Sequence, residues 1–333
     1  MQKDDNTVFV YANSYYGIFV GLYMKSLGYK VILLTYTDNI KKACNALELN
    51  YISIAFFTNK DFIFNSKAVS KEIKRLTDVV GKKQFHFSHR QFDILCFLLT
   101  DRLKTRSNVY FHPIENLFLD SFSKMKRLIK KRFYIHLIIK LFINIKWNLK
   151  LKIIVYPNMV LLGLNNAFFN SGINKINYNQ SFGSLKKQLI IQNQIKSEPC
   201  VNLFVTQPYK TIGAISGTSV YNLISEINNC GIDITFKYHP RDSNRANKRE
   251  FYPSYLPVEL LYTNVKNSVI SVYSTSLIHA CEHSHIIAIS ILDMIKWNDQ
   301  SYREEMRAFL KKESNNNIYF PTSLEELKDL LEY

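Results

Sequence analysis

Residues 7–35 read TVFVYANSYYGIFVGLYMKSLGYKVILLT, and their pattern indicates the fold class. Residues 7–12 form a short apolar run of β-prone side chains and predict a strand, and residues 30–35 predict a second one. The segment between them begins with helix-capping residues and predicts a helix over residues 16–27 that ends near Gly28. Two buried strands joined by a helix indicate a parallel, doubly wound α/β sheet. This segment has no GxGxxG pattern, so we expect no dinucleotide cofactor there.

The alternation of strands and helices continues along the chain. In the first half, strands are expected at residues 51–56, 108–111 and 151–156, and a helix at residues 88–103. In the second half, strands are expected at residues 201–206, 232–238, 269–273, 285–289 and 318–321. Helices are expected there at residues 219–230, 274–281 and 300–312, and a last one after Thr322.

The length of 333 residues predicts two domains. A polar, Asn-rich stretch at residues 171–200 places the boundary near residue 190. We therefore expect an N-terminal Rossmann-like domain over residues 1–190 and a C-terminal one over residues 191–333. The last helix could pack back on the first domain.

Charge is distributed unevenly along the chain. The net charge is +16, yet residues 121–197 contain fourteen Lys or Arg residues and no acid. Residues 124–152 hold ten of these, interleaved with aromatic and aliphatic residues at spacings of three and four. This pattern predicts a basic amphipathic helix, which either lies on anionic lipid or packs on the core with a solvated basic face. Nucleic acid is not expected as a partner, because no nucleic-acid motif accompanies the charge.

Signals of compartment and metal binding are weak. The N-terminus shows no secretory signal pattern, and the five cysteines include no CxxC pair, as is typical of reduced cytoplasmic thiols. His279 and His283 are spaced for one helix face, but no HExxH pattern surrounds them, so we expect no metal. No apolar run reaches the length of a membrane span. We expect a cytoplasmic protein, peripheral on the inner face of a bacterial inner membrane.

A basic motif follows the strand expected at residues 232–238. It consists of Lys237, His239, Pro240 and Arg241. Pro240 disfavours a helical conformation for the residue before it, so His239 is presented on an extended stub. An imidazole and a guanidinium at the end of a strand suit a phosphate group. The alternative is an ordinary turn that contains a His-Pro pair.

Two further strand ends carry polar groups. Gln207 and Pro208 follow the first strand of the second half. They either belong to a binding site or form an ordinary strand-to-loop connection. A hydroxyl-rich turn joins the third strand of this half to a helix and consists of Tyr273, Ser274, Thr275 and Ser276. Amides and hydroxyls at such a turn can bind an anion, although the same pattern also serves as an N-cap. Together the three strand ends favour a bound phosphodiester or nucleotide.

In this order, the motifs resemble those of the bacterial sialyltransferases of glycosyltransferase family 52 and of the related bacterial polysialyltransferases. The resemblance covers residues 200–290 and rests on the His-Pro and serine motifs. It implies a GT-B fold, with two Rossmann-like doubly wound domains facing a cleft. It also implies a metal-independent, inverting transferase that uses no cofactor. CMP-sialic acid would be the donor substrate, and a glycan or glycolipid the acceptor.

The resemblance also implies roles for individual residues. His239 would contact the CMP phosphate and act as an acid or electrostatic stabiliser of the leaving group. Ser274 and Ser276 would hold the same phosphate, and Lys237 and Arg241 could add charge. Positioned donors stabilise a departing phosphate strongly.

The chain departs from this family in one respect. The family carries an acidic motif in the first half that supplies the general base, whereas the matching strand exit here, around Asn158, has no carboxylate. Either Asp38, Glu115 or Asp120 serves as the base, or the first half is aligned wrongly, or the enzyme is impaired. From the resemblance over residues 200–290 we expect a sialyltransferase that builds lipooligosaccharide or capsule. The alternatives are a transferase of another nucleotide sugar or of glycerol phosphate, and a non-catalytic nucleotide- or glycan-binding relative. A homodimer could form.

Overall fold

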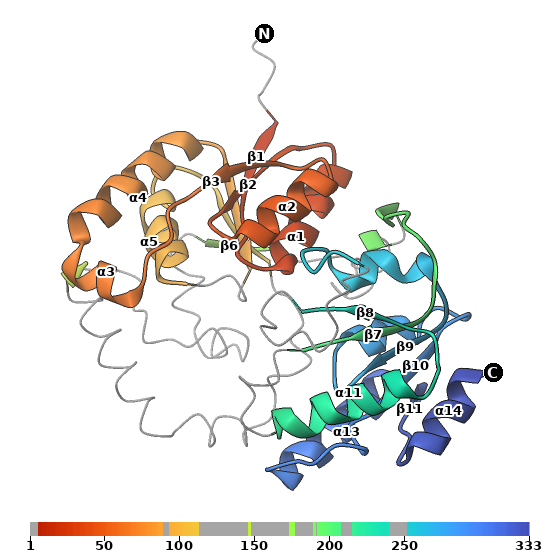
Figure 1. Ribbon diagram of the computed structural model, residues 1–333. Helices are drawn as coiled ribbons and strands as arrows, with labels where there is room; N and C mark the ends of the chain where they lie inside the picture. The colour runs from red at the N-terminus through yellow and green to blue at the C-terminus, as the bar shows by residue number, and fades with distance from the viewer. Residues whose placement is uncertain are drawn as a thin grey trace. The chain divides into compact units, whose positions relative to one another are not determined.

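The computed structural model describes residues 6–88, 93–112, 146–147, 173–176, 189–190, 192–207, 215–239 and 252–332. The chain divides into two compact units, Met1–Leu189 and Ile190–Tyr333, here called the N-terminal unit and the C-terminal unit (Figure 1). Each contains a parallel β-sheet covered by helices.

The N-terminal sheet has the strand order β3-β2-β1-β4-β5-β6, and every neighbouring pair is parallel. Its strands are β1 (Thr7–Tyr11), β2 (Lys30–Thr35), β3 (Asn50–Ser53), β4 (Gln84–Ser88), β5 (Val109–His112) and β6 (Ile173–Lys175). Its described helices are α1 (Tyr15–Ser26), α2 (Asp38–Ala46), α3 (Asn59–Phe64), α4 (Ser66–Val80) and α5 (Ile94–Leu103). This strand order is that of a doubly wound, dinucleotide-type sheet.

The opening segment folds as its residues require. All five residues of β1 are buried, as expected for a parallel strand covered on both faces. Gly21 lies in the middle of α1, where a glycine normally weakens a helix. A Cβ atom at this position would lie 3.3 Å from the Leu33 side chain, so the glycine lets α1 pack closely on β2.

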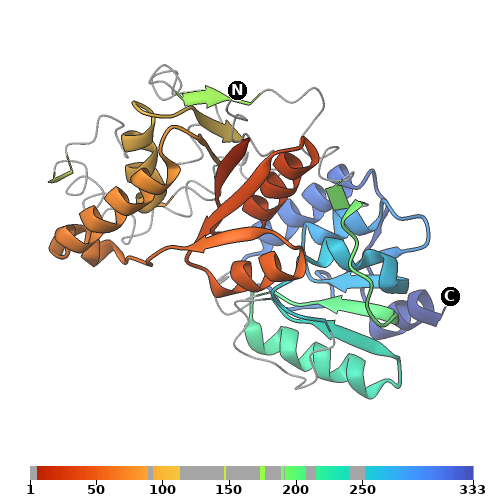
Figure 2. The same cartoon turned by 90° about the horizontal axis from the view of Figure 1, so that it is seen from above.

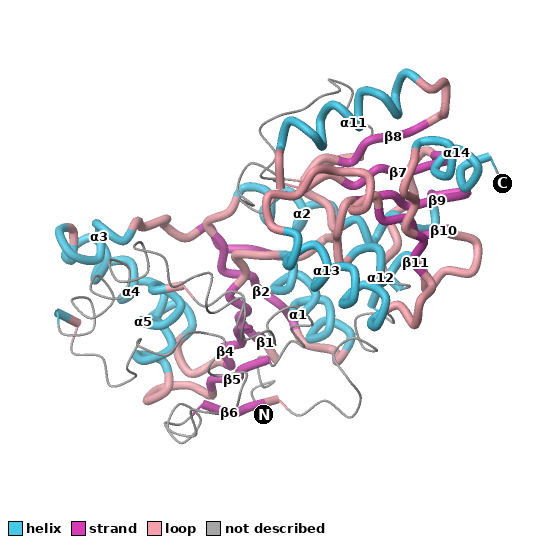
Figure 3. The backbone as a smooth tube through the Cα atoms, turned by 90° about the horizontal axis from the view of Figure 1, so that it is seen from below, coloured by secondary structure: helices cyan, strands magenta, loops and turns pink. Residues whose placement is uncertain are grey.

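The helices of the N-terminal unit cover opposite faces of its sheet. Right-handed crossovers put α1 and α2 on one face and α4 and α5 on the other, as Figure 3 shows. Aromatic rings from alternate strand positions fill the α4–α5 side, where the Phe87 ring centroid lies 6.1 Å from that of Phe85 and 5.4 Å from that of Phe111.

The C-terminal sheet has the order β11-β10-β9-β7-β8 and is also parallel throughout. Its strands are β7 (Cys200–Val205), β8 (Ile234–Lys237), β9 (Val265–Ser271), β10 (Ile287–Ser290) and β11 (Ile318–Tyr319). Its described helices are α11 (Gly217–Asn229), the 3-10 helix η3 (Val258–Asn264), α12 (Ser276–Ala280), α13 (Gln300–Glu313) and α14 (Leu324–Glu332). In Figure 2, α11 runs along β8 and β7. The amide of Asn267, in β9, donates to the carbonyl of Leu331 at 3.1 Å, which holds α14 to its own unit.

The sequence prediction for residues 88–103 was wrong at its start. Residues Gln84–Ser88 form β4, and α5 begins only at Ile94. The side chain of Asp93 caps this helix by accepting from the backbone N–H of Cys96 at 2.8 Å. An Asp before an apolar run is an N-cap signal. The mainly apolar residues that follow Asp93 form α5, and the strand β4 ends before Asp93.

The expected α/β class, with two Rossmann-like doubly wound units, is confirmed. Two such units in series are the components of a GT-B fold, whereas a cleft between them stays a prediction. The expected strand at residues 151–156 lies outside the described residues, as does the basic segment 124–152 except for Lys146 and Trp147. None of the helices in the described part of the chain is both long and apolar enough to span a bilayer.

Candidate functional site

The candidate site lies at the carboxyl edge of the C-terminal sheet. From β7 the chain runs through α11 to β8, which lies on one side of β7. From β9 it runs through α12 to β10, which lies on the side of β9 that faces away from β7. The two connections therefore diverge between β7 and β9. Ligands of open parallel sheets bind at such a switch point, beyond the carboxyl ends of the strands. Gln207, His239 and Ser274 follow β7, β8 and β9, three adjacent strands.

His239 is held at this edge through its backbone. Thr206, just beyond β7, donates its N–H to the carbonyl of Lys237 at 3.0 Å, which extends the pairing of β7 with β8. Its side-chain oxygen accepts the backbone N–H of His239 at 2.9 Å. Thr206 is 2% exposed, so both bonds are shielded from water. The half-buried imidazole of His239 therefore starts from a fixed backbone position.

Gln207 presents a buried acceptor beside His239. Its amide oxygen is inaccessible to solvent and has no hydrogen-bond partner among the residues that the structure describes. An unpaired buried acceptor costs about 1–3 kcal/mol. A donor group of a ligand at the switch point would remove this cost.

The serine turn after β9 is organised by its own hydrogen bonds. The backbone N–H of Ser276 donates to the Ser274 hydroxyl oxygen at 3.2 Å, and the Ser276 hydroxyl donates to the same oxygen at 2.7 Å. A hydroxyl has two acceptor lone pairs and one proton. Because Ser276 occupies both lone pairs, the proton of Ser274 is left to donate elsewhere, which suits an anionic oxygen.

Ser276 itself is part of the packing. It is 3% exposed, and its carbonyl accepts from the buried hydroxyl of Tyr262 at 2.6 Å. Thr275 is the half-buried N-cap residue of α12. Ser274 is half-buried, at the outer side of a turn that Ser276 and Tyr262 support.

Two predicted site residues lie in the interior of the unit. Lys237 ends β8 and is 4% exposed. Tyr273 packs its ring against Trp297 and Tyr302, with centroids 5.8 and 6.2 Å apart, and burial raises the pKa of its hydroxyl. The structure therefore places Tyr273 in an aromatic cluster under the serine turn. Pro208, Pro240 and Arg241 lie outside the described residues.

An ion-pair cluster that the sequence analysis missed follows β10. The carboxylate of Asp293 is nearly buried and binds Arg303 at 2.7 Å and Arg307 at 2.8 Å, both from α13. These two arginines fix α13 against the end of β10. An i,i+4 arginine pair in a mostly polar helix resembles a solvated face, so this cluster could not be predicted from the local pattern.

The three histidines near α12 do not share a helix face. α12 ends at Ala280, so His283 lies beyond it, contrary to the i,i+4 placement expected from the spacing. The His283 ring contacts Tyr262 and His285 at centroid distances of 5.2 and 5.8 Å, and burial lowers its pKa. Within the described residues, no group of three or more His, Cys, Asp or Glu side chains could hold a metal ion.

The N-terminal unit has a polar cluster at its own switch point, between β1 and β4. Asp93 accepts from the Tyr11 hydroxyl at 2.8 Å, the Asn13 amide at 2.9 Å and the Tyr36 hydroxyl at 3.1 Å. With the Cys96 N–H, four donors converge on this one carboxylate. Burial raises its pKa, which the hydrogen bonds oppose. Asp93 ties β1, β2 and α5 together and has little capacity left to act as a base.

The base candidates from the sequence are placed only in part. Asp38 begins α2, is exposed and pairs with Lys41 at 2.9 Å, and hydrogen bonding to Lys41 lowers the pKa of this carboxyl. A carboxylate with a lowered pKa is a weaker proton acceptor. Glu115 and Asp120 lie outside the described residues.

A buried histidine pair joins β4 to β5. Nδ1 of His86 lies 2.8 Å from Nε2 of His112, and Nε2 of His86 lies 3.1 Å from the Gln84 side-chain oxygen. Gln84 Oε1 can only accept, so His86 donates through Nε2 and accepts through Nδ1. Burial lowers the pKa of His86 to about 3 and holds that of His112 well below its usual value. Both rings are therefore neutral, and their hydrogen bond links β4 to β5 within the sheet.

No protein-family model matches the sequence, and no curated protein sequence matches it. Among solved structures, the chain is similar to the glycotransferase of kitacinnamycin, at 9% identity over 98% of this chain and 89% of that one, with a TM-score of 0.46. It is similar to a UGT transferase from Siraitia grosvenorii in complex with UDP, at 10% identity over 95% and 85%, with a TM-score of 0.42. A third is spinosyn rhamnosyltransferase SpnG, at 9% identity over 97% and 100%, with a TM-score of 0.40. Likenesses this distant carry no argument about chemistry, which rests on the site.

Proposed function

We propose that the protein is a glycosyltransferase that binds a nucleotide-activated sugar at the carboxyl edge of the C-terminal sheet. The observation that carries this proposal is the convergence of Gln207, His239 and Ser274 at the ends of three adjacent strands, beside the switch point. The buried acceptor of Gln207 suits a donor on the base or the sugar. The imidazole of His239 suits the leaving phosphate, and the hydroxyl proton of Ser274 suits a phosphate oxygen.

The chemistry we propose is leaving-group stabilisation. A glycosyl transfer from a nucleotide sugar leaves negative charge on the departing phosphate. His239 would donate a hydrogen bond or a proton to that phosphate, and Ser274 would donate to a second phosphate oxygen. Donors that are already in place before the charge develops contribute most to the rate. Thr206 and Ser276 hold these two residues in place, because they bind the backbone of His239 and the hydroxyl of Ser274.

We further propose CMP-sialic acid as the donor and a galactosyl glycan of lipooligosaccharide or capsule as the acceptor. The support is the resemblance of residues 200–290 to the sialyltransferase motifs. In this proposal the protein is cytoplasmic and peripheral on the inner membrane, with residues 124–152 on anionic lipid. The general base is drawn from Asp38, Glu115 and Asp120, and the weakly basic, exposed Asp38 is the least suited of these.

The test is nucleotide release. Purified full-length protein is incubated with a galactosyl acceptor and, in separate reactions, CMP-sialic acid, UDP-sugars and TDP-sugars. Release of CMP supports the sialyltransferase proposal, and release of another nucleotide supports a different donor. If no nucleotide is released and none raises the melting temperature, the glycosyltransferase proposal fails. Nucleotide binding without turnover would favour a non-catalytic relative, for which the acid-free stretch at residues 121–197 is the supporting observation.

A further inference from the structure

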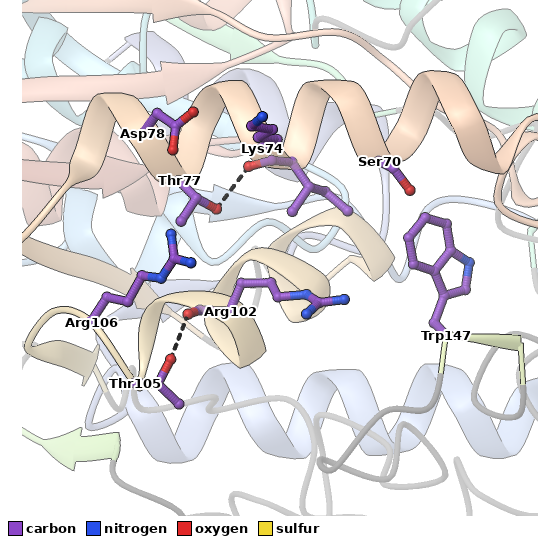
Figure 4. A pocket seen from close by; sticks show the side chains of 9 residues that line it. Ser70, Lys74, Thr77, Asp78, Arg102, Thr105, Arg106 and Trp147 are labelled. Carbon is purple, nitrogen blue, oxygen red and sulfur yellow. Dashed lines mark hydrogen bonds between the residues drawn. The ribbon is translucent and has the colours of Figure 1, made fainter.

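A pocket lies in the N-terminal unit between α4 and α5. It has a volume of about 330 Å³, within the range of small-molecule sites. Figure 4 shows the side chains that line it. They are Ser70, Ile73, Lys74, Thr77 and Asp78 of α4, Arg102 of α5, Thr105 and Arg106 just beyond α5, and Trp147. Both helices lie on one face of their sheet, and the pocket is near their carboxyl ends, far along the chain from the strand ends of the candidate site.

The pocket is positively charged. Lys74, Arg102 and Arg106 line it against one carboxylate, Asp78. In the described residues no ion pair neutralises any of the three cations. Asp78 is exposed and makes no ion pair there, and two further acids near the pocket are engaged elsewhere. Glu72 binds Arg75 at 2.7 Å. Asp101 binds Lys104 at 2.9 Å.

The geometry of the pocket is suited to one anion. Arg102 reaches from α5 toward the middle of the pocket, and Arg106 extends toward Thr77 and Asp78 (Figure 4). The C-terminus of α5 favours cations there through the helix dipole, which helps to keep the two arginines close together. The hydroxyls of Thr77 and Thr105 donate to backbone carbonyls at 2.8 and 3.2 Å, so the N–H groups of the cations are the main donors left for a ligand.

Trp147 closes one end of the pocket. Its indole N–H donates to the carbonyl of Phe62 at 3.0 Å, and the adjacent Lys146 ammonium binds the carbonyl of Ile63. Both acceptors belong to α3, so these two residues of the otherwise undescribed basic segment are fixed against the α3–α4 helices. With its N–H engaged, the indole offers the pocket a ring surface. Tryptophan is enriched where an apolar group meets a polar headgroup.

We propose that this pocket binds a phosphate-bearing group, with Arg102, Arg106 and Lys74 on the phosphate and Trp147 against the carbon skeleton that carries it. A guanidinium group binds phosphate oxygens through two parallel N–H donors, and this geometry favours phosphate over a diffuse anion. The ligand is either a phospholipid headgroup or a free phosphorylated polyol. The proposal does not depend on the donor site of the C-terminal unit.

Two ligand forms distinguish these sources. The full-length protein is titrated with glycerol 3-phosphate by calorimetry and co-sedimented with phosphatidylglycerol vesicles, with phosphatidylcholine vesicles as the neutral comparison. The pocket variant is Arg102→Gln with Arg106→Gln. The matched control is Lys25→Gln with Lys42→Gln, which removes two exposed cations from α1 and α2 on the other face of the sheet. Both variants lose the same net charge.

We expect the pocket variant to weaken binding of at least one ligand form tenfold or more, and the control variant to weaken it less than threefold. Loss confined to vesicles identifies a lipid headgroup, and loss of glycerol 3-phosphate binding identifies a free phosphorylated ligand. The emission of Trp147, measured in a Trp297→Phe background, should shift on binding. Equal weakening in the two variants would overturn the proposal, because it indicates attraction by net charge alone. Absence of binding to both ligand forms in the unsubstituted protein would also overturn it.

Discussion

The backbone N–H of His239 donates to the side-chain oxygen of Thr206 at 2.9 Å, across the ends of β8 and β7. This bond joins the two strand ends at the point where the parallel ladder stops. The residue with the proposed chemical role is therefore positioned by a buried hydroxyl on the neighbouring strand. The contribution of this positioning can be tested by substituting Thr206 while the imidazole of His239 is kept.

Replacing Thr206 by Val keeps the shape of the side chain and removes the acceptor. The His239 N–H then loses its partner, and we expect the unfolding free energy to fall by about 1–2 kcal/mol. We also expect kcat to fall about tenfold, because a misplaced imidazole stabilises the leaving group less well. Steady-state kinetics and urea unfolding measure the two effects. Thr206→Ser, which keeps the hydroxyl, should recover most of both, and equal kcat values for the Val and Ser variants would contradict a positioning role.

Replacing Ser274 by Ala removes the proposed phosphate donor. It also leaves the buried hydroxyl of Ser276 without its acceptor. We expect kcat/KM for the nucleotide sugar to fall about 10–100-fold, since a donor to a charged group contributes roughly 1.5–3 kcal/mol. The matched control is Ser225→Ala on α11, whose hydroxyl bonds the Tyr221 carbonyl at 3.0 Å and no other group among the described residues. If both variants keep full kcat/KM, Ser274 does not contact the donor.

Replacing Asp93 by Ala should destabilise the N-terminal unit. The change removes the N-cap of α5 and leaves the buried hydroxyl of Tyr11 without a partner. The sum of these effects is about 3 kcal/mol of unfolding free energy. Asp78→Ala is the control, because this exposed carboxylate on α4 makes no ion pair with described residues, and its loss should change stability little. Similar stabilities for the two variants would show that the hydrogen-bond cluster around Asp93 does not hold the unit together.

The buried pair of His86 and His112 predicts a pH dependence of stability. Both folded-state pKa values lie below the unfolded value of about 6.5, and that of His86 is about 3. Between these values the unfolded chain binds more protons, so stability rises with pH through this window and is lost on acidification. From pH 7 to pH 5 we expect His86 to contribute a loss of about 2 kcal/mol, and His112 a further loss in the same direction.

Urea unfolding of the N-terminal unit can be followed by Trp147 fluorescence in a Trp297→Phe background. Replacing His86 by Phe and His112 by Leu removes both titrating rings and should flatten the pH profile between pH 7 and pH 5. If the unfolding free energy of the protein with both histidines does not change between pH 7 and pH 5, the two rings become protonated in the folded protein as they do in the unfolded chain.

Much of the fold follows from local sequence. The strands β1 and β2 are continuous apolar runs, and β2 coincides with the expected residues 30–35, because a strand buried on both faces has no polar side to obscure its pattern. In the N-terminal unit, the strand β4 was missed. Its residues QFHFS include His86, and one of the ring nitrogens of His86 is bonded by His112, far away in the sequence. Local patterns cannot reveal such a pairing.

The candidate site was predicted in part. Gln207, His239 and Ser274 are at strand ends, as the order of apolar runs indicated. That these strands are neighbours depends on the order β9-β7-β8, which no local pattern contains. The support from Thr206 was missed because a threonine after a strand carries no signal of its own. Asp93 was missed because its three side-chain donors come from β1, from the turn after β1 and from the residue that follows β2.

If His239 acts on the leaving phosphate of a nucleotide sugar, its imidazole is needed for transfer more than for binding. His239→Ala is compared with the unsubstituted protein in two measurements on the same preparation, nucleotide affinity by calorimetry and nucleotide release from the sugar donor. We expect release to fall by 100-fold or more, while the nucleotide still binds within about tenfold and the melting temperature is unchanged. Release at the unsubstituted rate in a folded His239→Ala protein would contradict this role of His239.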